Sequence, residues 1–115
     1  SILSADEVVR FLEAVPSLKT RVALTTAYAA GLRASEAVSL QVADIDSSRM
    51  VLQVRHGKGA KDRTVMLSAA LLVILRSYWR LARPAPWLFP GRSPDKPIDV
   101  QVLTPPAARR RRRQG

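Results

Sequence analysis

The hydrophobic period of this sequence changes twice along the chain, and these changes constrain the fold more than any other feature. Between residues 18 and 30, apolar residues fall on nearly all sides of a helix, which indicates a helix in the core. From residue 42 to residue 67, short runs alternate between apolar and polar residues, as strands do. A helical spacing returns after residue 68. This order predicts an α+β fold, mainly helical, with helices around a small three-stranded antiparallel sheet.

Local signals set the ends of the predicted helices. Residues 4–7 read SADE, a capping box that opens a helix ended by Pro16. The helix at residues 18–30 ends at Gly31, because glycine adopts the left-handed C-cap conformation with the least strain. Ser68 is the predicted N-cap of the last helix. The core-facing residues of that helix are predicted to be Leu71, Leu72, Leu75, Tyr78, Trp79 and Ala82.

The alternating region predicts three short strands joined by turns. ADID, residues 43–46, forms the first. The run MVLQVRH forms the second and places Leu52, Val54 and His56 on one face. GKGAKD is a turn, and RTVML is the third strand.

Positive charge is concentrated in one folded segment and at the C-terminus. The chain carries 19 Lys and Arg residues against 9 Asp and Glu residues, a net charge of +10. Residues 49–83 hold eight basic residues against Asp62 alone, so this segment carries +7. Such a distribution is typical of proteins that bind polyanions, although a solvated basic surface gives the same count.

Composition excludes several classes of protein. The chain has no cysteine, and a lone histidine, His56, does not make a zinc site, so we expect no disulfide, metal or cofactor. No apolar run reaches the roughly 18 residues that span a bilayer. We therefore expect a cytoplasmic protein that has no membrane partner.

Two basic residues stand at constrained backbone positions. Arg33 follows a glycine turn at the start of a helix, and a guanidinium matches two phosphate oxygens. Lys58 lies between two glycines at a hairpin tip, where it could contact a phosphate or donate a proton. Lys61 and Arg63 extend this basic edge as contacts that position phosphates. Taken singly, Arg33 is explained as well by a structural pair with Glu36, and Lys58 by a solvated hairpin tip.

Three segments, in this order, resemble one known family. They are TAYAAGLRASEAVSLQVADID, VRHGKGAKDRTVMLS and WLFPGR. Together they resemble the first half of the catalytic domain of tyrosine recombinases, the phage-integrase and Xer-like family, over about residues 4–103. The pair GLRxSE and GKGxKxR is highly specific for that family.

The resemblance implies a role for each residue singled out above. Arg33 would be the first catalytic arginine and would bind the scissile phosphate of DNA. Lys58 would protonate the leaving 5′-hydroxyl, with Lys61 and Arg63 as further DNA contacts. Glu36 would support the turn that carries Arg33. The implied partners are double-stranded DNA and, in the complete enzyme, other recombinase protomers, without a cofactor.

Other parts of the family's active site are absent from the sequence. The family uses a tyrosine nucleophile and an H-x-x-R motif, but His56 has Gly59 at the arginine position. Tyr28 and Tyr78 lie on apolar helix faces and are predicted to pack in the core. Residues 1–103 are therefore predicted to be a partial catalytic domain from a truncated copy of a mobile element's recombinase. Residues 104–115 are predicted to be a disordered or frameshifted arginine-rich tail.

Two functional hypotheses follow. In the first, the chain is a DNA-binding fragment of a tyrosine site-specific recombinase or integrase. The complete enzyme would integrate and recombine DNA through a 3′-phosphotyrosyl intermediate. In the second, the chain is a non-catalytic DNA-binding module or regulator. The sequence leaves open whether this chain is itself an enzyme.

Overall fold

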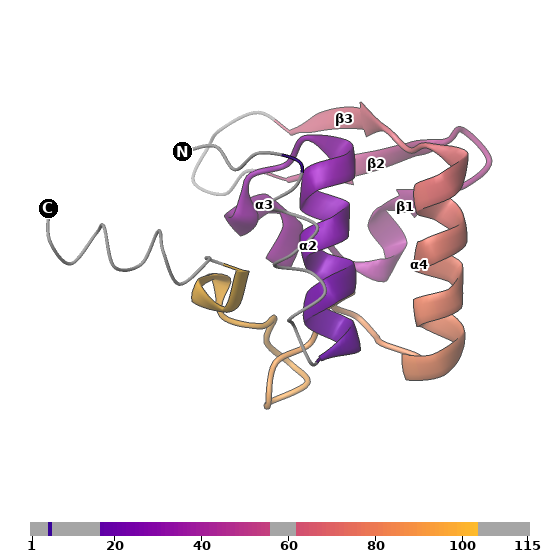
Figure 1. The fold of residues 1–115 in the computed structure, drawn as a ribbon. Coiled ribbons are helices and arrows are strands. Elements are labelled where there is room, and N and C mark those ends of the chain that lie inside the picture. The colour runs from indigo at the N-terminus through magenta and orange to yellow at the C-terminus, as the bar shows by residue number, and fades with distance from the viewer. Residues whose placement is uncertain (1–4, 6–16, 56–61, 104–115) are drawn as a thin grey trace, which may run out of the picture.

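A computed structural model describes residue 5, residues 17–55 and residues 62–103 (Figure 1). The helices that follow Ser17 are α2 (Leu18–Ala30), α3 (Ala34–Val38), η1 (Val42–Asp44), α4 (Ala69–Ala82) and η2 (Val100–Leu103), where η marks a 3-10 helix. The strands are β1 (Ile45–Asp46), β2 (Val51–Val54) and β3 (Arg63–Met66). Three predicted features lie outside the described residues: the helix before Pro16 apart from Ala5, the hairpin tip, and the arginine-rich tail.

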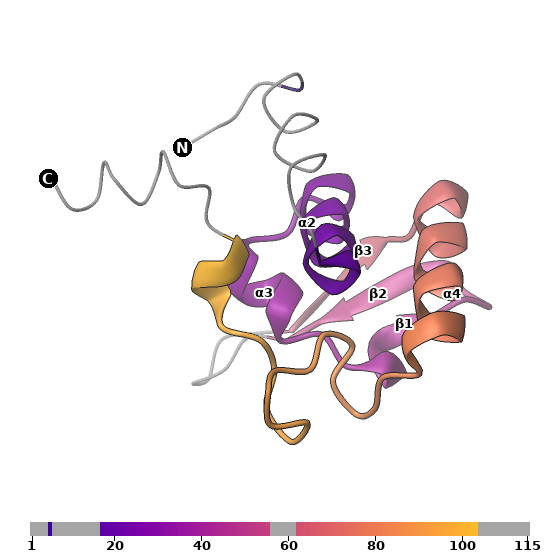
Figure 2. The ribbon, with the colours of Figure 1, turned by 60° about the horizontal axis from the view of Figure 1, so that its bottom comes forward.

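The predicted α+β fold with a three-stranded antiparallel sheet is confirmed. The central strand β2 pairs with β1 and β3, and the register sets Leu52 opposite Ile45 and Val54 opposite Arg63. Leu52 and Val54 are fully buried, as their alternation predicted. α2 and α4 lie side by side on one side of the sheet, and α3 and η2 lie at the end next to α2 (Figures 1 and 2). The core is therefore enclosed between the sheet and the two long helices.

Helix α2 covers the predicted residues 18–30 and is capped at both ends. The Ser17 hydroxyl accepts a hydrogen bond from the Thr20 amide at 3.4 Å and caps the N-terminus. Gly31 adopts the left-handed conformation with φ 68°, and its amide donates to the Ala27 carbonyl. The buried Thr26 hydroxyl donates to the Val22 carbonyl at 2.7 Å, so this polar side chain enters the core with its hydrogen bond made.

The two tyrosines differ from each other, and the prediction was right for only one. Tyr78 is 2% exposed, its ring lies 5.6 Å from that of Phe89, and its hydroxyl donates to the Leu88 carbonyl at 2.8 Å. Burial raises the pKa of Tyr78 to about 12, because the ionised phenol would lose its water. Tyr28 was also expected in the core, but it is 60% exposed. The small residues of α2 fill its inward face and leave the ring of Tyr28 outside.

The core-facing side of α4 is narrower than predicted. Ser68 caps the helix, as expected, by accepting a hydrogen bond from the Leu71 amide at 3.1 Å. Trp79 was predicted to face the core, but it is 37% exposed and lines an open cavity of about 370 Å³ between α4 and β1. The Arg83 guanidinium lies 4.1 Å from the centre of the Trp79 ring and covers it. Ala82 is also exposed rather than buried.

The segment after α4 returns to the chain between α3 and β1. The Val42 amide donates to the Pro86 carbonyl at 2.9 Å, and the Leu88 amide donates to the Leu40 carbonyl at 3.0 Å. Leu88 and Phe89 are fully buried beneath these hydrogen bonds. Residues 86–89 therefore fix the backbone that follows α3. Arg33 is the N-cap of this helix, so the same contacts help to hold it in place.

We predict that Tyr78→Phe lowers the free energy of unfolding by about 1 kcal/mol, because the buried Leu88 carbonyl loses its donor. Urea titration followed by circular dichroism measures the change. The matched control is Tyr28→Phe, which removes the same hydroxyl from an exposed side chain and should leave the midpoint unchanged. Equal effects at both positions would contradict the assignment of the Tyr78 hydrogen bond.

Candidate DNA-binding and catalytic site

Arg33 stands at the N-terminus of α3, where the turn after α2 fixes its backbone. Gly31 reverses the chain with its left-handed conformation, and the buried Leu32 donates its amide to the Ala27 carbonyl at 2.8 Å. Arg33 follows as the N-cap with an extended backbone, φ −70° and ψ 153°, and its carbonyl accepts from Ala37 at 3.0 Å. The backbone of Arg33 is thus hydrogen-bonded while its side chain is exposed.

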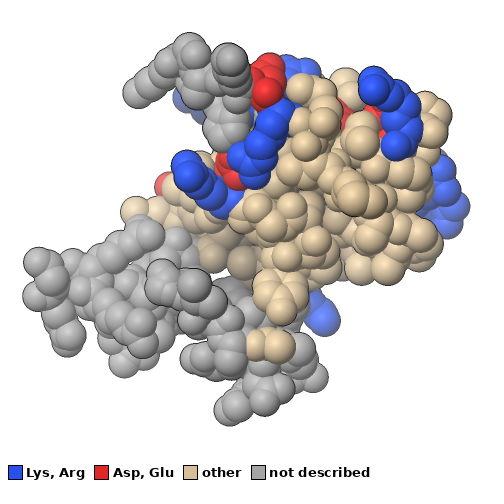
Figure 3. All heavy atoms as spheres, turned by 90° about the horizontal axis from the view of Figure 1, so that it is seen from above, with Lys and Arg blue, Asp and Glu red and all other residues tan. Residues whose placement is uncertain are grey.

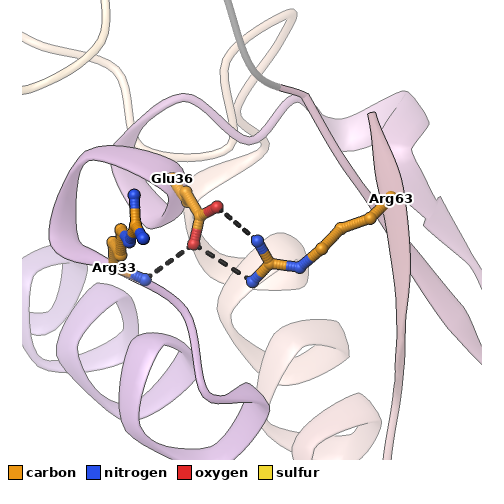
Figure 4. A network of polar contacts seen from close by, with 3 residues as sticks. All are labelled: Arg33, Glu36 and Arg63. Atoms are coloured by element: carbon orange, nitrogen blue, oxygen red, sulfur yellow. Dashed lines mark hydrogen bonds and ion pairs between the residues drawn. The ribbon is translucent and has the colours of Figure 1, made fainter. Parts of the chain in front are cut away.

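Glu36 joins the Arg33 turn to the sheet (Figure 4). Its side chain is only 4% exposed. Oε1 accepts the Arg33 amide at 2.8 Å and Nη2 of Arg63 at 3.2 Å, and Oε2 accepts Nη1 of Arg63 at 2.7 Å. Two parallel bonds between a guanidinium and a carboxylate are among the strongest side-chain hydrogen bonds in proteins. One buried carboxylate therefore connects α3 with the first residue of β3.

This network changes how the arginines of the site are interpreted. One explanation of Arg33 was a structural pair with Glu36, but the group of Arg33 that Glu36 binds is the backbone amide. Figure 4 shows the Arg33 guanidinium turned away from the carboxylate. Among the described residues, Glu36 forms its ion pair with Arg63. Arg63 was predicted as a phosphate contact, and its pairing with Glu36 gives it a structural contact that sequence reasoning missed.

The hairpin lysines lie outside the described residues, but both ends of their loop are described. Val54 pairs with Arg63 across the two strands, so the chain leaves β2 and enters β3 beside the Glu36 network. Residues 56–61, which contain Lys58 and Lys61, connect these two points. The structure therefore brings Arg33, Glu36 and Arg63 together and places both ends of the lysine loop next to them.

The basic residues of segment 49–83 do not form one continuous face. Arg55 and Arg63 lie at the loop end of the β2–β3 hairpin, while three further arginines of segment 49–83 belong to α4 or its C-cap, and α4 lies away from that end of the hairpin (Figure 1). Those on or next to α4 are Arg76, Arg80 and Arg83, all exposed. Seen from above, the Lys and Arg side chains stand in separate groups around a broad uncharged area (Figure 3). Among the described arginines of this segment, Arg63 is linked to the Arg33 turn through Glu36.

The part of the chain that the structure describes contains no cluster of metal-ligating side chains and no membrane-spanning helix. No three His, Cys, Asp or Glu side chains in residues 17–55 and 62–103 are grouped as metal ligands would be. Among the same residues, the helices are too short and too polar to cross a bilayer.

Known proteins with similar sequences are integrases and recombinases. The profile of the phage integrase family matches residues 1–115. A putative integrase/recombinase, y4eF, from Sinorhizobium fredii (strain NBRC 101917 / NGR234) is 62% identical over 97 residues, which cover 84% of this chain and 39% of that protein. Tyrosine recombinase XerA from Pyrococcus horikoshii is 35% identical over 88 residues, 76% of this chain and 31% of XerA.

Solved structures show the same fold. A crystal structure of XerA recombinase superimposes with a TM-score of 0.68 at 30% identity, over 90% of this chain and 38% of that one. XerH recombinase bound to a palindromic difH substrate superimposes with a TM-score of 0.65 at 21% identity, over 84% of this chain and 31% of XerH. This chain thus spans between 31 and 39% of the length of these proteins. The predicted family is confirmed, and the chain belongs to the phage integrase family of tyrosine recombinases.

Proposed function

We propose that this chain is the DNA-binding N-terminal part of a tyrosine recombinase catalytic domain, and that it acts on duplex DNA in site-specific recombination or integration. The observation that carries the proposal is the Glu36 network, which fixes the backbone of an exposed arginine next to the ends of a lysine-bearing loop. Family membership and the structural likeness to XerA support it. A place of action in the bacterial cytoplasm, on nucleoid DNA, is part of the same proposal.

Arg33 is proposed to bind the scissile phosphate. A guanidinium offers two parallel donors to two phosphate oxygens. Charge develops on those oxygens as the phosphate is attacked, so a fixed cation lowers the barrier. A fixed backbone matters here, because a donor held in place needs no rearrangement when the charge forms.

Lys58 is proposed to act as the general acid, with Lys61 as a phosphate contact beside it. In the proposed step a tyrosine phenolate, supplied by the complete enzyme, attacks the phosphorus, and the bond between phosphorus and the 5′-oxygen breaks. The tyrosine becomes joined to the 3′-phosphate, and the leaving 5′-oxygen takes its proton from the Lys58 ammonium. An ammonium placed within hydrogen-bond reach of the leaving oxygen can perform this transfer.

Glu36 and Arg63 are proposed to keep Arg33 and Lys58 in fixed positions relative to each other. The Arg63 side chain is 42% exposed although its guanidinium binds Glu36. It can therefore support the turn from inside and still lie near a phosphate on its solvent side. In this proposal a second recombinase protomer and the DNA duplex are the partners of the complete protein.

The first prediction from the proposed function is that duplex DNA binding is electrostatic and weakly specific. If about four phosphates are neutralised, the slope of log affinity against log salt is about −3 to −4. Gel-shift titrations at several salt concentrations measure it. The assay needs a chain ending at Leu103 beside the full one, because five consecutive arginines bind any polyanion. Affinity that does not change with salt in the shorter chain would contradict the proposed DNA-binding role.

The second prediction concerns the energy of the Glu36 pair. Glu36→Gln keeps an acceptor for the Arg33 amide but loses the charge, so the free energy of unfolding should fall by about 2 kcal/mol. Arg63→Met should cost a similar amount, and the double variant should cost much less than the sum, since both changes remove one interaction. Urea titration measures all three, with exposed Arg92→Met as control. Strictly additive costs would show that the two side chains are not coupled.

The third prediction separates the roles of Arg33 and Lys58. It uses a hybrid in which residues 1–103 are joined to the C-terminal remainder of y4eF, the 62% identical relative, and a suicide substrate that accumulates the cleaved product. Arg33→Ala should abolish cleavage, and Lys58→Ala should slow it strongly while leaving DNA affinity nearly unchanged. In a substrate with sulfur in place of the leaving 5′-oxygen, the leaving group departs without taking up a proton. That substrate should restore cleavage by Lys58→Ala and not by Arg33→Ala. Normal cleavage of the oxygen substrate by Lys58→Ala would exclude the general-acid role.

A further inference from the structure

A second buried carboxylate stands beside the site. The side chain of Asp44, the last residue of η1, is 1% exposed. Its Oδ2 accepts the Gln41 amide at 2.9 Å, and Nη2 of Arg55 lies 2.8 Å from its Oδ1. A buried carboxylate is costly without a compensating positive charge, and Arg55 supplies that charge here.

The Asp44–Arg55 pair is placed like the Glu36–Arg63 pair, but its contact is an ion pair only, because Asp44 Oδ1 makes no hydrogen bond within the described residues. Each carboxylate is the third residue of a short helix, and each accepts the backbone amide of the residue three positions earlier. Each is paired with an arginine at the loop end of the β2–β3 hairpin. Arg55 directly follows β2, and Arg63 is the first residue of β3. The loop of residues 56–61 is thus bounded on both sides by an arginine bound to a buried acid.

The burial of the two partners is unequal, and this restricts what Arg55 can do. The Arg55 side chain is 49% exposed, whereas Asp44 is almost fully enclosed. Movement of Arg55 to another partner would leave the Asp44 Oδ1 atom without its cation in a place that water does not reach. This favours Arg55 as a residue held in place over Arg55 as a mobile phosphate contact.

We propose that Asp44 and Arg55 form a positioning pair, which fixes the β2 arm of the hairpin against η1 as Glu36 and Arg63 fix the β3 arm against α3. Through the two arms, the pair sets the direction in which the intervening loop leaves the domain. The inference rests on the proposed function in one respect: the loop that it orients carries Lys58. The effect of the pair on the position of the loop can be measured without DNA.

The test measures the position of the loop in the full 115-residue chain without DNA. The chain has no cysteine, so Ala60→Cys in the loop and Ser77→Cys on the exposed side of α4 give two unique sites for spin labels. Double electron–electron resonance then reports the distribution of distances between them. Lys58 itself stays unaltered in this reporter chain.

Three variants of the reporter chain test the pair. Arg55→Met removes the cation, Asp44→Asn removes the charge while its amide oxygen can still accept from Gln41, and Arg55→Lys restores a cation. Arg49→Met is the matched control, since it removes an exposed arginine from the turn before β2. That turn is held by the Asp46 carboxylate, whose Oδ1 accepts from the Arg49 amide at 3.0 Å, and not by the Arg49 side chain.

We expect the distance distribution to broaden or shift in Arg55→Met and in Asp44→Asn, to recover at least in part in Arg55→Lys, and to stay unchanged in Arg49→Met. Should Arg55→Met unfold the chain, Asp44→Asn decides the question, because it keeps the shape of the side chain. An unchanged distribution in Asp44→Asn would overturn the inference. So would a reporter chain whose distribution is already as broad as that of the variants.

Salt titration of duplex DNA binding distinguishes this inference from the proposed function. A direct phosphate contact by Arg55 would reduce the magnitude of the salt slope by about 1 in Arg55→Met, without any change in the distance distribution. That result would overturn the positioning role and leave the DNA-binding proposal standing. Conversely, salt-independent binding by the chain that ends at Leu103 would contradict the DNA-binding proposal and leave the spin-label result unaffected.

Discussion

The fold around the site depends on a carboxylate that is kept out of water. Glu36 is buried and ion-paired, and burial of such a group is costly unless a cation and hydrogen-bond donors compensate it. One of its oxygens receives the backbone of the Arg33 turn, and both receive the guanidinium of Arg63. The segment GLRASE is therefore one structural unit, in which the glycine turns the chain, the arginine is presented outward, and the glutamate fixes the turn to the sheet.

The rest of the domain supports this unit from behind. α2 and α4 pack on one side of the sheet, and the segment after α4 runs back to hydrogen-bond with Leu40 and Val42. The side chains of Leu88 and Phe89 fill the space beneath those bonds. Because interiors are packed as densely as crystals, a change in this core is transmitted as a displacement rather than absorbed. The exposed arginine thus stands on a short helix whose position is determined by distant parts of the chain.

The sequence predicted local structure well and contacts between distant segments poorly. The end of α2 at Gly31 and the start of α4 at Ser68 were predicted, because the signals of these residues act within one turn of a helix. The pairing of Glu36 with Arg63 joins residues 27 positions apart, and no local pattern encodes it. Tyr28 was misassigned for a related reason: a helix rich in alanine appears apolar on every side, and only its tertiary neighbours decide which side is covered. The hairpin lysines were recognised by family resemblance, and their roles stay proposals.

The paired arginines at the loop end of the hairpin have a consequence for how this surface can vary in evolution. Arg55 and Arg63 are ion-paired with acids that belong to helices and not to the loop. The contacts that hold the hairpin to these helices therefore end at those two arginines. The length and composition of the chain between them can then change without disturbing the core. Lengthening a connection is inexpensive, since each doubling of a flexible loop costs only about 0.6 kcal/mol. If Lys58 has the proposed role, the residues around that lysine can change by insertion or replacement while the scaffold below the loop stays in place.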